Sequence, residues 1–259
     1  MKQAIIDIGS NSIRLTVYET EGQSFRILFR EKIMAGLAGY VEDGKLSAEG
    51  IECACAGLLT FRKILQTLQI ENVRIFATAS LRNISNTARA LSVIRAATGY
   101  SVEVISGEDE ALFGYAGAMR KLRLTGGAFL DIGGASTEIV TFEDNAPVDF
   151  SSFPIGSLSL YRRCVKKILP GDGSLKRLRQ EIGKTTDVSE GALKSRALLV
   201  GVGGTARAAL KLARHYYGIS DDCRSITAEQ LVVSKYGVRE GYLCQRILKN
   251  HTDTPKTRS

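Results

Sequence analysis

Histidine is scarce in this sequence, and the scarcity excludes two common kinds of catalytic site. The 259 residues include only His215 and His251, too few for a histidine-based zinc site and a poor basis for a Ser-His-Asp hydrolase. The five cysteines are odd in number and lack a CxxC spacing, so we expect reduced thiols and a cytoplasmic protein. No apolar run approaches the roughly 18 residues of a membrane span, and the first residues resemble a strand, not a signal peptide.

The charge is strongly positive and unevenly distributed. The formal net charge is +8, and residues 162–196 hold ten Lys/Arg against four Asp/Glu. Clustered cations raise the local concentration of anions, so this basic stretch is either a solvated helical surface or a groove for a polyanion. No zinc finger, helix-turn-helix or aromatic RNA-binding signature accompanies it, and nucleic acid is therefore not the expected partner.

A pattern of about sixteen residues occurs twice. Residues 4–19 read AIIDIGSNSIRLTVYE, and residues 128–143 read AFLDIGGASTEIVTFE. Each copy predicts a strand, a tight loop that follows an aspartate, and a returning strand. A repeat half a chain apart predicts two similar lobes whose aspartate-tipped loops face each other. The identical pairs are Ala4/Ala128, Asp7/Asp131, Ile8/Ile132, Gly9/Gly133, Ser12/Ser136 and Glu19/Glu143.

Both loops have the composition of phosphate-binding turns. Glycine allows the backbone to approach a ligand closely, and successive N–H groups in such a turn form an anion-binding nest. The aspartate would repel phosphate unless a divalent cation or a water lies between them. A plain hairpin turn uses the same residue types, but the second copy favours phosphate binding. The candidate phosphate-binding residues are Gly9, Ser10, Asn11 and Ser12 after Asp7, and Gly133, Gly134, Ala135, Ser136 and Thr137 after Asp131.

A third glycine cluster, Gly203-Gly204-Thr205, follows an apolar run at residues 197–200. The surrounding residues fit the dinucleotide pattern G-x-G-x-x-A, which is weak when it stands alone. No βαβ unit with an acidic strand end clearly follows, so a nicotinamide site is disfavoured. A third phosphate-facing or nucleotide-facing loop at the entrance to a helix fits better.

Periodicity predicts a mixed α/β protein with the element order β-β-β-α-β-α-β-α before the second copy of the repeat. The turn residues near 116–126 place the lobe boundary there, which gives lobes of residues 1–120 and 121–259. The expected elements after the first hairpin are a strand at 25–32, a helix from Ser47 to about Leu68, a strand at 73–77, a helix at 86–97 closed by Gly99, a strand at 102–105 and a helix from Ser106.

Six short motifs together resemble the exopolyphosphatase/guanosine pentaphosphate phosphatase (Ppx/GppA) family over nearly the whole chain. The resemblance implies a duplicated ribonuclease-H-like fold of the actin–hexokinase–Hsp70 class, with an active cleft between the lobes. The motifs are the first loop DIGSNS at 7–12, Thr78 with Arg82, ISGEDEA at 105–111 with Asp109 in place of a glutamate, the second loop through Glu138, the third loop at 203–205, and SKYGVREG at 234–241.

The resemblance implies hydrolysis of the terminal phosphate of inorganic polyphosphate or of guanosine pentaphosphate. It places the catalytic base at Glu110, makes Asp131 a second catalytic residue, and makes Arg82 a phosphate ligand. It also implies Mg²⁺ as cofactor, held by Asp7, Asp131 and Glu138. From the residues alone, Glu110 could equally be an acid favoured by the helix dipole, and Ser106 with Asp109 could form a capping box.

Two departures from the family pattern keep alternatives open. Ala135 stands where the second loop usually has a third glycine, and a Cβ there is costly only if φ is positive. The helical segment that normally separates the third loop from the terminal motif is largely missing, so the second lobe is short and its last helix would pack back on the body. A non-catalytic polyphosphate or alarmone binding protein is therefore the alternative, and a small-molecule kinase is disfavoured by GSNS. We also expect a homodimer that covers apolar surface on the short lobe.

Overall fold

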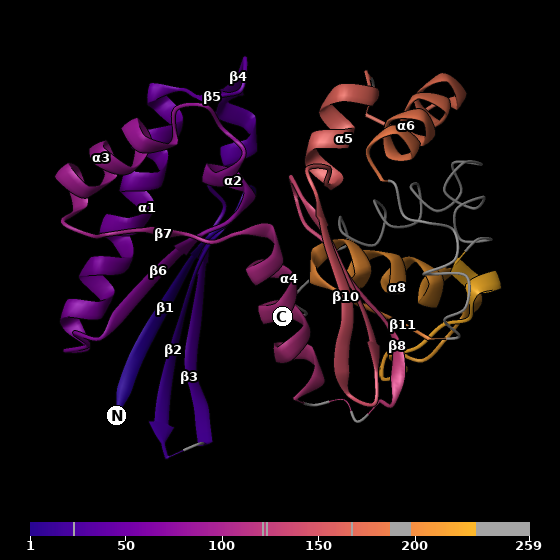
Figure 1. Ribbon diagram of the computed structural model, residues 1–259, viewed down its shortest axis with the longest axis horizontal. Helices are drawn as coiled ribbons and strands as arrows, with labels where there is room; N and C mark the ends of the chain where they lie inside the picture. The colour runs from indigo at the N-terminus through magenta and orange to yellow at the C-terminus, as the bar shows by residue number, and fades with distance from the viewer. Residues whose placement is uncertain (23, 121, 123, 167, 187–197, 232–259) are drawn as a thin grey trace, which may run out of the picture. The chain divides into compact units, whose positions relative to one another are not determined.

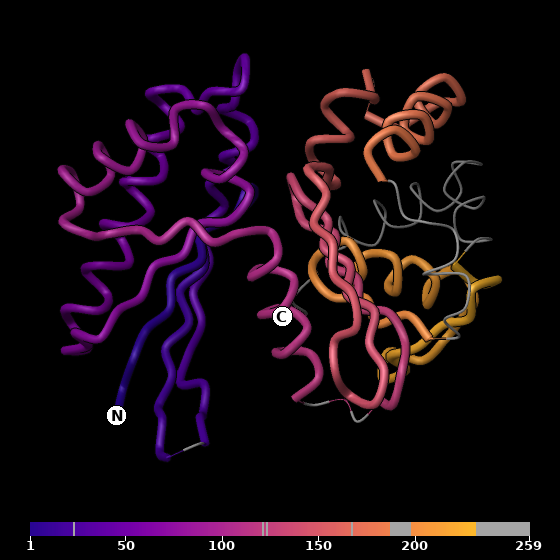
Figure 2. The backbone as a smooth tube through the Cα atoms, viewed as in Figure 1, coloured from indigo at the N-terminus to yellow at the C-terminus, as the bar shows by residue number. Residues whose placement is uncertain are grey.

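The computed structural model describes residues 1–22, 24–120, 122, 124–166, 168–186 and 198–231. The chain divides into two compact units, Met1–Val200 and Gly201–Ser259, and Figures 1 and 2 follow the backbone through them. The terminal motif at 234–241 lies outside the described residues, as do Lys167 and residues 187–197 of the basic stretch.

The first sheet has five strands in the order β3-β2-β1-β6-β7 (Figure 1). The first three strands form an antiparallel meander, and β6 and β7 continue the sheet in parallel with β1. The predicted strands are all present. Their bounds are β1 Lys2–Ile8, β2 Ile13–Glu21, β3 Ser24–Ile33, β6 Val73–Ala77 and β7 Glu103–Val104.

Helix starts and stops follow their capping residues. Ser47 Oγ accepts from Gly50 N at 3.2 Å and begins α1 (Ala48–Thr67), and Ser106 does the same for α4 (Gly107–Met119). Helix α3 (Thr87–Thr98) ends at Gly99, which has the left-handed conformation of a helix C-cap. The sequence did not predict four short elements: η1 Leu37–Tyr40, β4 Val41–Glu42, β5 Lys45–Leu46 and the one-turn helix α2 Ala79–Arg82.

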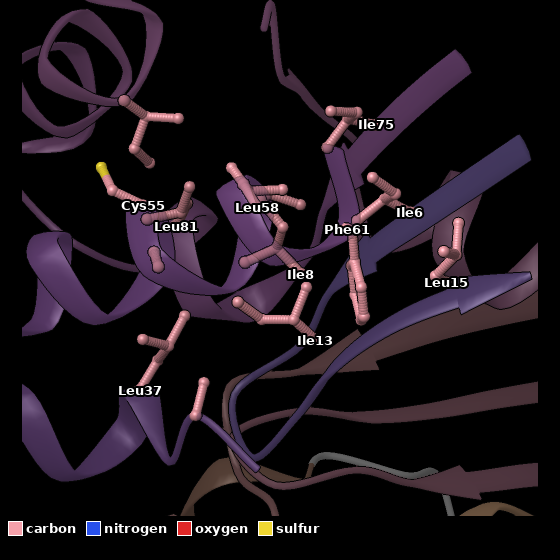
Figure 3. Packing of buried hydrophobic residues seen from close by; sticks show 14 of the residues in the cluster. Ile6, Ile8, Ile13, Leu15, Leu37, Cys55, Leu58, Phe61, Ile75 and Leu81 are labelled. Carbon is pink, nitrogen blue, oxygen red and sulfur yellow. The ribbon is translucent and has the colours of Figure 1, made fainter. Parts of the chain in front are cut away.

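One core lies between the first sheet and its helices. Alternate residues of β1 are buried, as expected for a strand with one face against a helix. Figure 3 shows Ile6 and Ile8 of β1 with Ile13 and Leu15 of β2 and Phe61 of α1, all fully or almost fully buried. This cluster fixes the strand register, because a slip of one residue would turn the apolar set to solvent.

The second sheet repeats the first meander and has the order β10-β9-β8-β11. Its turn has the same register: Ile8 lies opposite Ile13 in the first copy, and Ile132 lies opposite Thr137 in the second. Helix α4 contacts β8, β9 and β10, and Tyr115 of α4 packs its ring against Phe129 and Phe142. The remaining bounds are β8 Gly126–Ile132, β9 Thr137–Glu143, β10 Ala146–Phe153, α5 Ser157–Cys164, α6 Asp172–Thr185 and β11 Leu199–Val202.

The chain is therefore a mixed α/β protein with a duplicated sheet motif in two lobes, as predicted. The backbone passes from α4 to β8 between Met119 and Gly126, and the division into 1–120 and 121–259 stays a prediction. The second compact unit contains α8 (Gly203–Tyr217), which ends at a left-handed Gly218. Among the helices of the described residues, none is both long enough and apolar enough to span a bilayer.

Candidate active site

The two predicted phosphate loops have the same backbone geometry. Gly9 N donates to Ser12 O at 3.1 Å, and Gly133 N donates to Ser136 O at 3.0 Å. A Cβ on Gly9 would lie 3.1 Å from Ser12 O, and one on Gly133 would lie 3.2 Å from Ser136 O. Glycine is thus favoured at both positions by a close carbonyl and not by a positive φ.

Ala135 causes no backbone strain in the second loop. The non-glycine residues with positive φ in the described part of the chain are Asp43, Gln69, Asp144 and Asn145. Since Ala135 is not among them, its backbone does not have the left-handed conformation that only glycine adopts readily. The departure from the family pattern at this position therefore leaves the shape of the loop intact.

The two loops lie against each other. A Cβ on Gly134 would be 3.2 Å from the Cβ of Ser10, so the second loop contacts the first directly. The aspartates at their bases also interact: burial raises the pKa of Asp7, Arg14 lowers it, and the charge of Asp131 raises it again. The predicted meeting of the two aspartate-tipped loops is therefore present within the first compact unit.

Arg82 connects three further elements at this site. Its Nη1 donates to Glu110 Oε2 at 2.8 Å and to Ile105 O at 3.1 Å. Its Nη2 lies 3.9 Å from Glu138 Oε1. Helix α2, which ends at Arg82, is held at the base of the first loop because Ser80 Oγ donates to Ile8 O at 2.6 Å. Parallel pairing of β1 with β6 places these segments at the same sheet end.

Glu110 lies in the first turn of α4, as the sequence predicts. Burial raises its pKa above the ordinary range, the hydrogen bond and charge of Arg82 lower it, and Asp7 and Asp131 raise it further. Ser106 also caps this helix through Asp109 N at 3.0 Å. The cap explains why the helix starts here, whereas the contact with Arg82 is additional to any role in capping.

Glu138 is the most deeply buried acid of the group, with 2% of its side chain exposed. Burial and the charge of Glu110 raise its pKa to about 7, against the lowering effect of hydrogen bonds from Ser136 and Ser152. Ser152 Oγ on β10 donates to Glu138 Oε1 at 3.0 Å. At neutral pH the protonated form of this carboxyl is consequently populated.

Sequence reasoning missed two residues at the site. Arg14 donates from Nε to Ser12 Oγ at 3.2 Å and lies 3.9 Å from Asp7 Oδ2. The hairpin signal could have identified it, because strands joined by a four-residue turn place Arg14 opposite Asp7. Ser152 carries no such signal, since its contact depends on the register of β9 with β10, which places it opposite Glu138.

Asp7 and Asp131 have the chemistry of a divalent-cation site. Two neighbouring carboxylates whose charges oppose each other's ionisation favour a cation between them. Within the described residues, however, no group of three or more His, Cys, Asp or Glu side chains is arranged to hold a metal ion. The three-ligand set of Asp7, Asp131 and Glu138 stays a prediction.

The third predicted loop begins a helix, as expected. Gly203, Gly204 and Thr205 form the first turn of α8, and Gly203 has a φ of 80°. This turn belongs to the second compact unit. The basic stretch includes the end of α5 and all of α6, and Arg163 of α5 pairs with Glu181 of α6 at 3.7 Å. Part of that stretch is therefore a helical surface with its own ion pairs.

The duplicated sheets and the paired aspartate loops define a protein of the actin-like superfold. The sequence model of the Ppx/GppA phosphatase family matches residues 16–232, and the chain belongs to this family. The match spans Arg82, Glu110 and the second loop, and it begins just after the first loop.

Solved structures agree with this assignment. An exopolyphosphatase from Cytophaga hutchinsonii superposes with a TM-score of 0.79 at 22% identity, over 94% of this chain and 80% of that one. The Aquifex aeolicus member of the Ppx/GppA family has a TM-score of 0.64 at 28% identity, over 89% and 72%. An exopolyphosphatase-like protein has a TM-score of 0.69 at 23% identity, over 83% and 70%.

Proposed function

We propose that this protein hydrolyses the terminal phosphoanhydride of inorganic polyphosphate or of guanosine pentaphosphate, with Mg²⁺ as cofactor. The observation that carries the proposal is the convergence of two phosphate loops on one cluster of Arg82, Glu110 and Glu138. Phosphoryl transfer needs mainly positioning and charge stabilisation. Backbone N–H groups of the two loops and the guanidinium of Arg82 are suited to that task.

Glu110 is the proposed general base. A carboxylate accepts a proton from water more effectively when its pKa lies nearer the working pH, and burial moves the pKa of Glu110 in that direction. The hydrogen bond from Arg82 favours the ionised form, which is the form that can accept the proton. Arg82 thus keeps the base charged while its planar fork suits a phosphate oxygen.

Asp7 and Asp131 are the residues that would hold Mg²⁺. When bound, the ion would offset the charges of these carboxylates and of the substrate phosphate. Without it, two aspartates beside a polyphosphate would repel the substrate. The family description alone leaves open the choice between polyphosphate and guanosine pentaphosphate, so phosphate release from the two should be compared side by side, with and without Mg²⁺.

Glu110→Gln tests the base assignment. Glutamine keeps the shape and can still accept from Arg82, but it cannot take a proton from water. We expect phosphate release to fall by about 10²–10⁴-fold, while binding of substrate persists or tightens because a negative charge is removed. Phosphate release and equilibrium binding should be measured on the same preparations.

Glu108→Gln is the matched control, because Glu108 lies in the same first turn of α4 and is outside the proposed site. Equal rates in the wild type and Glu110→Gln would rule out Glu110 as the base. Binding of polyphosphate without phosphate release in either protein would favour the non-catalytic binding protein.

A further inference from the structure

Helix α5 is bonded at its start to the second phosphate loop. Ser157 N donates to Gly133 O at 2.9 Å, and Leu158 N and Ser159 N both donate to Gly134 O at 3.0 Å. The contact is close, because a Cβ on Gly156 would lie 2.5 Å from the carbonyl carbon of Gly134. The first turn of α5 is therefore held against the second loop by these hydrogen bonds.

The segment around η1 is bonded in the same way to the first loop. Ala38 N donates to Ser10 O and Gly36 N donates to Asn11 O, both at 2.9 Å. Leu37, between them, is fully buried in the core of the first sheet. The position of Ala38 is thus tied to that of Ser10.

Arg162 links α5 to the segment around η1. From the second turn of α5, its Nη1 donates to the backbone carbonyl of Ala38, across 124 residues of sequence. The path runs from the second loop through α5 and Arg162 to η1 and the first loop. Its neighbour Arg163 does not bridge in this way and pairs instead with Glu181 of α6.

We propose that Arg162 is a positioning residue that holds the two phosphate loops in register for catalysis. The proposal rests on the proposed phosphohydrolase function, and it assigns Arg162 no contact with substrate. Both loops must aim their N–H groups at one phosphoryl group, and a displacement of about 1 Å can cost about 10²-fold in rate. A hydrogen bond between α5 and the segment around η1, each bonded to one loop, restricts that displacement.

The kinetic test compares Arg162→Met with Arg163→Met, which removes the same charge from the same turn of the same helix. Positioning predicts that Arg162→Met lowers kcat by at least about 10-fold relative to Arg163→Met, on tripolyphosphate and on long-chain polyphosphate alike. A role in attracting polyanions predicts instead that both variants raise KM for the long chain, with kcat similar in the two. Equal kcat values would overturn the proposal.

A second readout does not depend on activity. In Ser10→Cys/Gly134→Cys, the two Cβ positions lie 3.2 Å apart. This is slightly closer than the roughly 3.5–4.5 Å of a disulfide, so a small displacement of the loops allows the bridge to form. We expect Arg162→Met in this background to slow formation of that disulfide on the order of 10-fold, with Arg163→Met close to the parent. Peptide mapping by mass spectrometry identifies the bridge among the native cysteines.

The two readouts separate the failure of each proposal. If the wild type releases no phosphate, the proposed function fails, and the rate of disulfide formation still decides whether Arg162 positions the loops. If phosphate is released but both arginine variants form the disulfide at the parent rate, the positioning role is wrong and the phosphohydrolase stands. Equal thermal unfolding midpoints of the two single variants confirm that both are folded.

Discussion

At the scale of single residues, the site gathers more carboxyl groups than guanidinium groups. Asp7, Glu110 and Glu138 all have pKa values raised by burial, and Arg82 contacts two of the three. A buried carboxylate without full compensation destabilises the folded state. The site is therefore stabilised by the surrounding fold against its own repulsion, as expected where a bound cation supplies the missing positive charge.

The pH dependence of stability tests this interpretation at Glu138. Its pKa rises from 4.5 to about 7 on folding, so the folded state binds more protons between these values. Stability therefore falls as the pH rises through that window and levels off above it. Between pH 5 and pH 8 the loss is on the order of 2–3 kcal/mol, and Glu138→Gln should remove most of it.

Urea unfolding of both proteins at pH 5 and pH 8, in EDTA so that no cation screens the carboxylates, measures the difference. The raised pKa values of Asp7 and Glu110 change stability with pH in the same direction, but both residues are present in the wild type and in Glu138→Gln. Only the difference between the pH dependences of these two proteins therefore reports on Glu138. An identical pH dependence in the wild type and in Glu138→Gln would contradict the buried, raised-pKa state.

At the scale of elements, the second loop and the start of α5 are in close backbone contact. Gly156 has an extended φ of −148°, so its requirement is for space alone. A Cβ there would lie 2.5–2.7 Å from the backbone of residues 133–135. The two elements are thus in contact through main chain, where rearranging a side chain gives no relief.

Gly156→Ala should consequently destabilise the protein by about 1–3 kcal/mol and lower phosphate release by displacing the second loop. Gly171→Ala is the control: Gly171 precedes α6 as its N-cap, and a Cβ there would have no atom within 4 Å. The control should cost less than about 1 kcal/mol. Equal midpoints of urea unfolding in the two variants would show that the backbone at this junction accommodates a Cβ at little cost.

The basic surface of α5 and α6 is the second feature at this scale. Charge reversal of Lys166 and Lys176, both exposed, should weaken binding of long-chain polyphosphate and flatten its salt dependence. Exposed charges act over roughly 10 Å at 0.1 M salt, so tripolyphosphate bound at the loops should be affected less. Lys63→Glu on α1 is the control. An unchanged affinity and salt slope in the double variant would show that the two lysines belong to a solvated surface with no role in binding polyphosphate.

At the scale of the whole molecule, exposed apolar side chains occur in both halves of the described chain, but the large buried cluster lies in the first. The large core cluster lies entirely among residues 4–94. In the second half, Ile168 is 89% exposed, Val148 58% and Leu199 53%. A contiguous patch of such side chains would mark an interface, and a second copy of the chain is the partner that the short second lobe predicts.

A homodimer is therefore expected, and light scattering over a wide range of concentration measures it. Ile168→Asp should shift the equilibrium toward the monomer, since a charge at a buried apolar contact is costly. Val93→Asp, at an exposed apolar position of α3 in the first half, should leave the mass unchanged. A monomeric wild type at every concentration, free of aggregation, would contradict the expectation.

The sequence by itself determined the features that depend on local pattern. The repeat predicted both hairpins and their loops, and short apolar runs predicted the other strands of the first sheet. Ser47, Gly99 and Ser106 marked helix ends because their caps are local interactions. The short elements around η1 and α2 escaped prediction, since they are held by contacts with the first loop and not by their own propensities.

Tertiary structure alone decided which distant groups form hydrogen bonds. Arg82 reaches Glu110 across 28 residues, Ser152 reaches Glu138 across 14, and Arg162 reaches Ala38 across 124. Each contact requires a sheet register or a helix packing that no local pattern specifies. The raised pKa of Glu138 has the same origin, because desolvation depends on everything that surrounds a carboxyl and not on its neighbours in sequence.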